Sequence, residues 1–197
     1  MSVMVKICGL SDAEHVNVAV EAGADAIGFV FADSPRRVTP LEAATICASV
    51  PSHIKRVAVM RHPANDEWQA VLHAFSPDVL QSDVEDYAAL DVPDSIERWP
   101  VYREGGSRPD TKGAYIYEGQ KSGQGETVDW SLAASIAAIG QMILAGGLAV
   151  QNVATAIATV RPFGVDVSSA VESARGQKDA QLINEFVNAV RAAEKDL

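Results

Sequence analysis

Short apolar runs alternate with longer segments along most of the chain, and in the longer segments apolar residues recur at helical spacing. Runs of four to seven apolar or β-branched residues bounded by turn residues are typical of buried strands. The pattern predicts eight such strands, over residues 3–8, 25–31, 54–60, 78–81, 99–103, 113–117, 141–145 and 163–167.

Capping residues mark where several helices begin. Ser11 followed by Glu14 has the spacing of a capping box, and Thr39 precedes Pro40, which favours the first turn of a helix. Together with the apolar spacing, these signals predict helices over residues 11–22, 40–50, 65–75, 84–90, 130–139, 150–161 and 182–190, the fourth of them short and weak. Residues 104–112 are rich in Gly and Pro, so we expect no helix there.

Eight strands separated by helices favour parallel pairing through right-handed crossovers. Eight is also the number of strands that closes a (β/α)8 barrel, so we expect an α/β protein formed by one such barrel over residues 1–197. The chain is shorter than the roughly 250 residues typical of this fold, and the missing fifth helix accounts for part of the difference. An open doubly wound sheet is the alternative, but no G-x-G-x-x-G follows the first strand.

Composition and charge narrow the possible partners. The chain has 197 residues, of which 48% are hydrophobic, and its net charge of −10 argues against nucleic acid and anionic membranes as partners. No apolar run approaches the ~20 residues of a membrane span, and the first residues do not resemble a signal peptide, so we expect a cytoplasmic protein. The two cysteines, Cys8 and Cys47, are expected to be reduced thiols. The sequence leaves the oligomeric state open between a monomer and a homodimer.

In a barrel of this kind the functional groups lie on the loops after the carboxyl ends of the strands. Gly146 and Gly147 follow the seventh strand and lead toward a helix, and Ser168 and Ser169 follow the eighth. Backbone amides in such loops bind anions, and phosphate sites after strands seven and eight recur in this fold. A tight strand-to-helix turn is the alternative interpretation of the two glycines.

Four further side chains occupy the same end of the predicted strands. They are Cys8, Arg36, Glu118 and Asp166. A thiolate can act as nucleophile or base, a carboxyl can transfer a proton, and a guanidinium can bind a carboxylate in forked geometry. The alternatives are a buried small thiol for Cys8, a solvated loop residue for Glu118 and a surface charge for Arg36.

Other residues contribute less to the prediction. Cys47 lies within a predicted helix and is interpreted as core, and His62 is the only histidine just beyond the end of a strand. No Cys/His/Asp group has the spacing of metal ligands, so we expect no metal site.

The chain resembles the phosphoribosylanthranilate isomerase family over nearly its whole length and in the same order. The matching segments are residues 6–10 (KICGL), 28–31 (GFVF) with 34–38 (SPRRV), 128–130 (VDW), 144–148 (LAGGL) with 152–153 (NV), and 164–172 (GVDVSSAVE) with 176–179 (GQKD). The family is a compact barrel whose fifth helix is replaced by a loop.

The resemblance implies an Amadori rearrangement of a phosphosugar in tryptophan biosynthesis, with no redox cofactor and no metal. It implies that Cys8 is the general base and that Glu118 is the general acid, at a position where the family has Asp. Arg36 would face the anthranilate carboxylate, and Asp166 would hold a sugar hydroxyl or the amine. The phosphate would bind at Gly146, Gly147, Ser168 and Ser169.

Three positions depart from the family pattern. Besides Glu118, the family's Gln-Leu-His-Gly after strand four is replaced by residues 81–84 (QSDV), and the glycine loop after strand six is only partly kept in residues 122–125 (SGQG). Two other functions therefore stay in view. One is a different phosphosugar isomerase that also serves histidine synthesis, and the other is a phosphate-binding module without activity.

Overall fold

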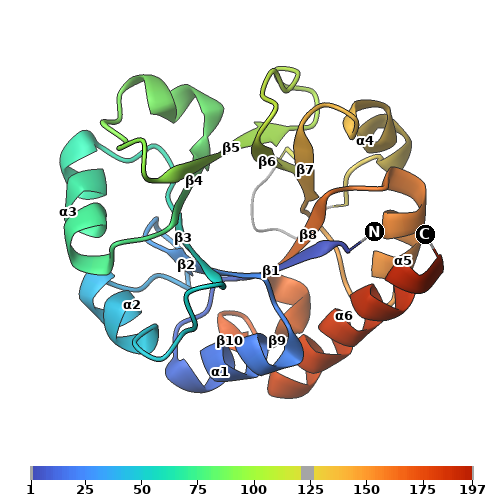
Figure 1. The fold of residues 1–197 in the computed structure, drawn as a ribbon, viewed down its shortest axis with the longest axis horizontal. Coiled ribbons are helices and arrows are strands. Elements are labelled where there is room, and N and C mark those ends of the chain that lie inside the picture. The colour runs from blue at the N-terminus through green and yellow to red at the C-terminus, as the bar shows by residue number, and fades with distance from the viewer. Residues whose placement is uncertain (1, 121–126, 197) are drawn as a thin grey trace.

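The computed structural model describes residues 2–120 and 127–196, and within them eight parallel strands form a closed barrel, seen end-on in Figure 1. Neighbouring strands in sequence are neighbours in the barrel, and β8 pairs with β1 to close it. The strands are β1 (Met4–Cys8), β2 (Ala26–Val30), β3 (Lys55–Val59), β4 (Val79–Asp83), β5 (Glu97–Arg103), β6 (Ala114–Glu118), β7 (Gln141–Leu144) and β8 (Gly164–Val167). The predicted fold class is confirmed.

Helices surround the barrel on the outside (Figure 1). The α-helices are α1 (Ala13–Ala22), α2 (Pro40–Ile46), α3 (Asn65–Phe75), α4 (Trp130–Ile136), α5 (Val153–Val160) and α6 (Ala180–Ala193). Short 3-10 helices are η1 (Val84–Ala88), η2 (Ser169–Val171) and η3 (Glu194–Asp196), and a small hairpin pairs β9 (Glu172–Ala174) with β10 (Gln177–Lys178).

The missing fifth helix is confirmed, because residues 104–113 connect β5 to β6 by turns alone. The weak helix predicted over residues 84–90 is the 3-10 helix η1. The glycine loop predicted after strand six lies largely in residues 121–126, outside the described residues.

The predicted start of the first helix was wrong by one residue. Asp12, not Ser11, is the N-cap of α1, and its carboxylate accepts hydrogen bonds from the backbone and the ring of His15. A carboxylate at this position also interacts favourably with the positive end of the helix. The predicted cap at Thr39 is confirmed, and the structure adds a capping box with Glu42, although α2 ends at Ile46 rather than at residue 50.

Strand alternation divides the core into two parts. One face of each strand points into the barrel, where Ala26, Val57, Val79, Trp99, Val101, Ala114, Ile116, Ile143 and Ala145 pack together. The other face packs against the helices through residues such as Ile7, Phe29 and Leu80, and it meets Trp68 and Phe186 from α3 and α6. Because side chains alternate along a strand, the inward positions beyond this inner core point into the mouth of the barrel.

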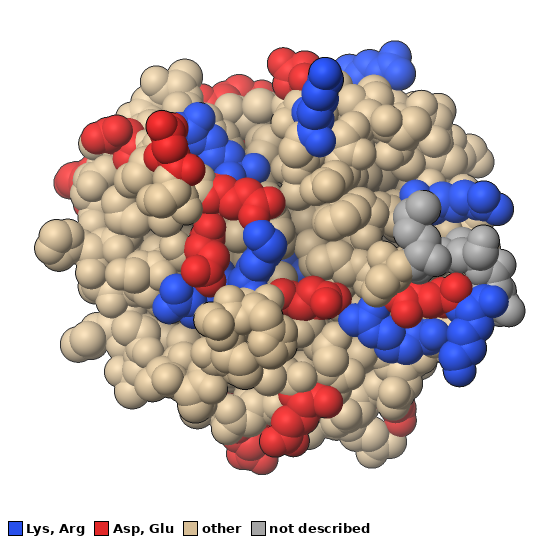
Figure 2. Space-filling view, in the orientation of Figure 1, with Lys and Arg blue, Asp and Glu red and all other residues tan. Residues whose placement is uncertain are grey.

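Acidic and basic side chains are intermingled on the face that Figure 2 shows, and the basic ones do not merge into one patch there. Among the described residues, no helix is long and apolar enough to cross a membrane.

The corrected cap yields a stability prediction. Replacing Asp12 by Ala should destabilise the protein by about 1 kcal/mol, because backbone amides at the start of α1 lose their acceptor. Urea unfolding at neutral pH measures the change. Ser11→Ala is the matched control and should leave the free energy of unfolding nearly unchanged; equal losses for the two variants would show that Ser11 also caps the helix.

Candidate active site

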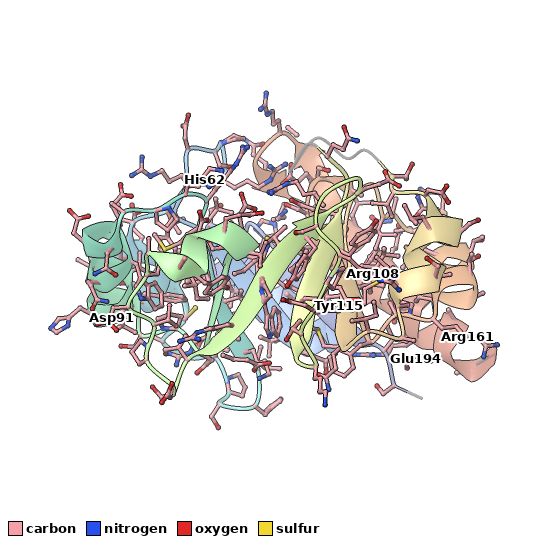
Figure 3. All side chains as sticks on the ribbon, turned by 90° about the horizontal axis from the view of Figure 1, so that it is seen from above. His62, Asp91, Arg108, Tyr115, Arg161 and Glu194 are labelled. Carbon is pink, nitrogen blue, oxygen red and sulfur yellow. The ribbon has the colours of Figure 1, made fainter. Side chains whose placement is uncertain are left out.

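A cavity of about 210 Å³ opens at the carboxyl ends of the barrel strands. Residues at the carboxyl ends of the strands and in the loops that follow them line it. All eight residues predicted to form the site line this cavity: Cys8, Arg36, Glu118, Gly146, Gly147, Asp166, Ser168 and Ser169. In the side view of Figure 3, His62, just after β3, stands at one rim of the molecule, while Arg161 and Glu194 lie toward the opposite end.

The alternation of the strands explains why these side chains meet. On β1, Val5 and Ile7 pack toward the helices, and Met4 packs against the inner core. Lys6 and Cys8 lie at the same alternate positions as Met4, so they follow it along the barrel interior toward the mouth. On β6, Ala114 and Ile116 pack in the inner core, and Glu118 follows them at the next alternate position.

A buried ion pair lies beneath the thiol. Lys6 and Asp166 are register partners on β1 and β8, and Lys6 Nζ donates to Asp166 Oδ1 at 2.9 Å. The Lys6 side chain is fully buried. Burial lowers the pKa of Lys6, but the neighbouring Asp166 carboxylate and Cys8 together raise it above its usual value. Asp166 is therefore bound to Lys6 as well as facing the cavity.

Gly28 on β2 provides the space for these groups. A Cβ on this glycine would lie 3.1 Å from Cys8 Sγ and 3.2 Å from Lys6 Nζ, which places both atoms beside the same point. Burial raises the pKa of the Cys8 thiol, while the positive charge of Lys6 acts in the opposite direction. Burial prevails, so the pKa of the thiol is raised overall although the Lys6 ammonium lies beside it.

Arg36 is fixed by a partner that sequence reasoning did not identify. Its Nε donates to Glu172 Oε1 at 2.5 Å and its Nη2 donates to Glu172 Oε2 at 2.9 Å. Glu172 begins the β9–β10 hairpin, and Lys178 at the hairpin's end also donates to it at 2.8 Å. The surface-charge alternative for Arg36 is wrong, because the residue is buried.

The backbone at Gly9 makes room for Arg36. Gly9 has φ +75°, and a Cβ there would lie 2.4 Å from Arg36 Cδ. Only glycine combines this left-handed conformation with so close an approach.

The glycine pair after β7 forms a turn that a side chain stabilises. Gly146 and Gly147 both have positive φ. The side-chain Nδ2 of Asn152 donates to the Gly147 carbonyl at 2.9 Å, and its Oδ1 accepts from the Ala149 backbone N–H at 2.8 Å. Because α5 begins at Val153, the glycines do not open directly into the helix as the sequence suggested.

The loop after β8 is tied to β1. The Ser168 hydroxyl donates to the Cys8 carbonyl at 3.1 Å, and Lys178 Nζ donates to the Ser168 carbonyl at 2.9 Å. Ser169 begins the short 3-10 helix η2. The loops after β7 and β8 therefore border one cavity with Cys8.

Glu118 faces Arg103, which sequence reasoning also missed. Arg103 Nη2 lies 3.1 Å from Glu118 Oε1, and Arg103 Nη1 lies 2.5 Å from Asp83 Oδ1. His62 does not line the cavity, but its Nε2 lies 3.3 Å from Asp83 Oδ2. The signal that could have found Arg103 is its spacing of two from Val101, an inward core residue.

Gln81 is the other inward polar residue missed from the sequence. It lines the cavity from β4, and its Oε1 is buried without a hydrogen-bond partner among the described residues. A buried acceptor of this kind is costly unless a ligand satisfies it.

One group of residues has ligand atoms close enough for a metal. Atoms of His62, Asp83 and Asp86 lie within 4.8 Å of one another, although their sequence spacing gave no such sign. Both ring nitrogens of His62 face these carboxylates, Asp83 also holds Arg103, and Asp86 accepts from Ser82 at 2.6 Å. The group is therefore an ion-pair and hydrogen-bond network.

Comparison with known proteins shows to which family the chain belongs. The sequence model described as N-(5′-phosphoribosyl)anthranilate (PRA) isomerase matches residues 5–189. The chain belongs to this family. A curated N-(5′-phosphoribosyl)anthranilate isomerase of Geobacter sulfurreducens is 44% identical over 200 aligned residues, which cover 94% of this chain and 97% of the relative.

Solved structures of relatives have the same architecture. TrpF from Jonesia denitrificans is 34% identical with a TM-score of 0.83 over 98% of each chain. A PRA isomerase solved in complex with reduced 1-(o-carboxyphenylamino)-1-deoxyribulose 5-phosphate is 28% identical with a TM-score of 0.79, covering 96% of this chain and 99% of its own. The family assigned by resemblance is thus confirmed, and this PRA isomerase family member is an isomerase of tryptophan biosynthesis.

The Arg36–Glu172 pair yields a pH prediction. Burial alone would raise the pKa of Glu172, but hydrogen bonds from Arg36, Lys178 and the Gly176 amide lower it to about 2. A carboxyl with a lowered folded-state pKa contributes stability that is present above the unfolded value of about 4.3 and is lost as pH falls toward 2.

In Glu172→Gln, this part of the pH dependence should disappear. Urea unfolding from pH 6 to pH 3 should show a shallower fall in stability than in the wild type. Glu21→Gln, at an exposed position, is the control and should keep the wild-type slope. A slope for Glu172→Gln that equals the wild type would contradict the assigned pKa.

Proposed function

We propose that this chain converts N-(5′-phosphoribosyl)anthranilate to 1-(o-carboxyphenylamino)-1-deoxyribulose 5-phosphate with Glu118 as general acid and Cys8 as general base. The supporting observation is that the Cys8 thiol, the Glu118 carboxyl, the Arg36 guanidinium and the loops after β7 and β8 line one cavity. The relatives named for this isomerase activity support the substrate.

The first proton transfer opens the sugar ring. Glu118 donates a proton to the furanose ring oxygen as the bond between that oxygen and C1 breaks, which leaves a Schiff base between C1 and the anthranilate nitrogen. The Glu118 carboxylate formed in this step lies next to the Arg103 guanidinium. A positioned acid of this kind contributes on the order of 10²–10⁴ in rate.

The second proton transfer moves the double bond. The Cys8 thiolate removes the proton from C2, and the electron pair shifts toward C1 to give an enol amine, which tautomerises to the ketone. C1 is reduced as C2 is oxidised within one molecule, so the reaction requires no redox cofactor. Lys6 compensates charge on the thiolate, because it lies beside Cys8 in the barrel interior.

The remaining site residues hold the substrate. Arg36 binds the anthranilate carboxylate, and Asp166 accepts a hydrogen bond from a sugar hydroxyl or the amine. Gly146 and Gly147 bind the phosphate through backbone amides, and Ser168 and Ser169 complete that site. In a chain with net charge −10, such local donors must overcome the overall repulsion of a phosphate.

The protein is proposed to act as one catalytic domain over residues 1–197 in the cytoplasm. A relative from Thermotoga maritima is described as dimeric. For this chain, light scattering on the purified protein decides between monomer and homodimer.

The activity is tested directly with freshly made phosphoribosylanthranilate, whose anthranilate fluorescence should fall as the enzyme turns over. Cys8→Ser and Glu118→Gln should each lower kcat at least ~100-fold, since each removes one proton-transfer group. Cys47→Ser is the matched control. Cys47 is buried away from the cavity lining and should leave turnover near the wild-type rate.

Near-normal turnover in Cys8→Ser and Glu118→Gln would overturn the assigned roles. Turnover of the histidine-pathway phosphosugar would add that second isomerase activity. Binding of the substrate without any turnover would identify a binding module instead.

A further inference from the structure

An inward-facing chain of charges crosses three neighbouring strands on the wall of the cavity. Asp83 ends β4, Arg103 ends β5 and Glu118 ends β6, and all three line the cavity. We call this group the Asp83–Arg103–Glu118 bridge. Arg103 and Glu118 are direct register partners on β5 and β6, so the sheet itself sets them side by side.

Asp83 is the anchor of the bridge. Its side chain is only 3% exposed, and both of its carboxylate oxygens are engaged, Oδ1 by Arg103 at 2.5 Å and Oδ2 by His62 at 3.3 Å. A buried carboxylate requires such compensation, and it in turn restricts the guanidinium that provides it. Arg103 is therefore held in one orientation from the side opposite Glu118.

The length of Glu118 matters for the contact. Arg103 Nη2 lies 3.1 Å from Glu118 Oε1. A carboxyl one methylene shorter on the same backbone would recede by roughly 1.5 Å, the length of one carbon–carbon bond, and would leave hydrogen-bond range. The glutamate at this position therefore fits the bridge.

The charges of the bridge fit a group that gives up a proton. Arg103 carries the positive charge of the bridge and lies between the Asp83 and Glu118 carboxyls. When Glu118 donates that proton, the new carboxylate is already next to the guanidinium. Donors oriented in advance toward developing charge are worth more than donors that must reorganise.

We propose that Arg103, held by Asp83, is a positioning residue that orients the Glu118 carboxyl and compensates its charge after proton donation. This inference rests on the proposed role of Glu118. Asp83 and Arg103 act through Glu118 rather than on the substrate.

The test compares Arg103→Met in two backgrounds with the same fluorescence assay. In the wild-type background it should lower kcat on the order of 100-fold with little change in KM, because ring opening loses the charge that stabilises the carboxylate. In the Glu118→Gln background it should lower kcat far less, because the group through which it acts is already absent.

Controls separate this effect from misfolding and from the general loss of an arginine. Arg103→Met removes the guanidinium from Asp83, so Asp83→Asn combined with Arg103→Met provides a neutral pair. A Tm of this double variant close to the wild-type value would show that the fold is retained. This double variant should still have the lowered kcat. Arg37→Met removes an exposed arginine and should leave kcat unchanged.

The outcomes distinguish this inference from the proposed function. If millimolar methylguanidinium restores turnover to an Arg103→Ala variant, the positioning role of Arg103 is supported. Equal losses from Arg103→Met in both backgrounds, or a change confined to KM, would overturn it while leaving Glu118 as the acid. An absence of turnover in the wild-type protein would instead overturn the proposed function.

Discussion

Closure of the barrel between β1 and β8 is the constraint on which the site depends. It makes Lys6 and Asp166, 160 residues apart, direct partners inside the barrel, where the Lys6 side chain is fully buried. Two buried charges are tolerated only when they pair closely. Cys8, two residues beyond Lys6 on the same face, is thereby placed beside a fixed cation at the mouth.

The rest of the mouth follows the same rule, because each buried charge has an opposite charge beside it. Arg36 and Lys178 share Glu172, and Arg103 lies between Asp83 and Glu118. These networks hold long side chains in single orientations, which fixes the geometry of the groups that face the cavity. They also leave the strongly acidic chain with local positive groups facing the cavity.

The β9–β10 hairpin has a role that its size would not suggest. Glu172 and Lys178 lie at its two ends, and through them the hairpin contacts the loop that carries Arg36 and the loop that carries Ser168. Ser168 in turn bonds to the Cys8 carbonyl. Arg36, Ser168 and Cys8 are therefore connected through one short segment.

Local patterns in the sequence determined the fold class and the places where the site residues would lie. Alternating apolar runs specify strands, caps specify helix starts, and parallel strands put their carboxyl ends together, so Cys8, Glu118 and Asp166 could be assigned to one mouth. Only the tertiary structure decided which charges pair, since Lys6 with Asp166, Arg36 with Glu172 and Arg103 with Glu118 depend on strand register and barrel closure. Pairing is a property of distance in space, and a linear pattern does not contain it.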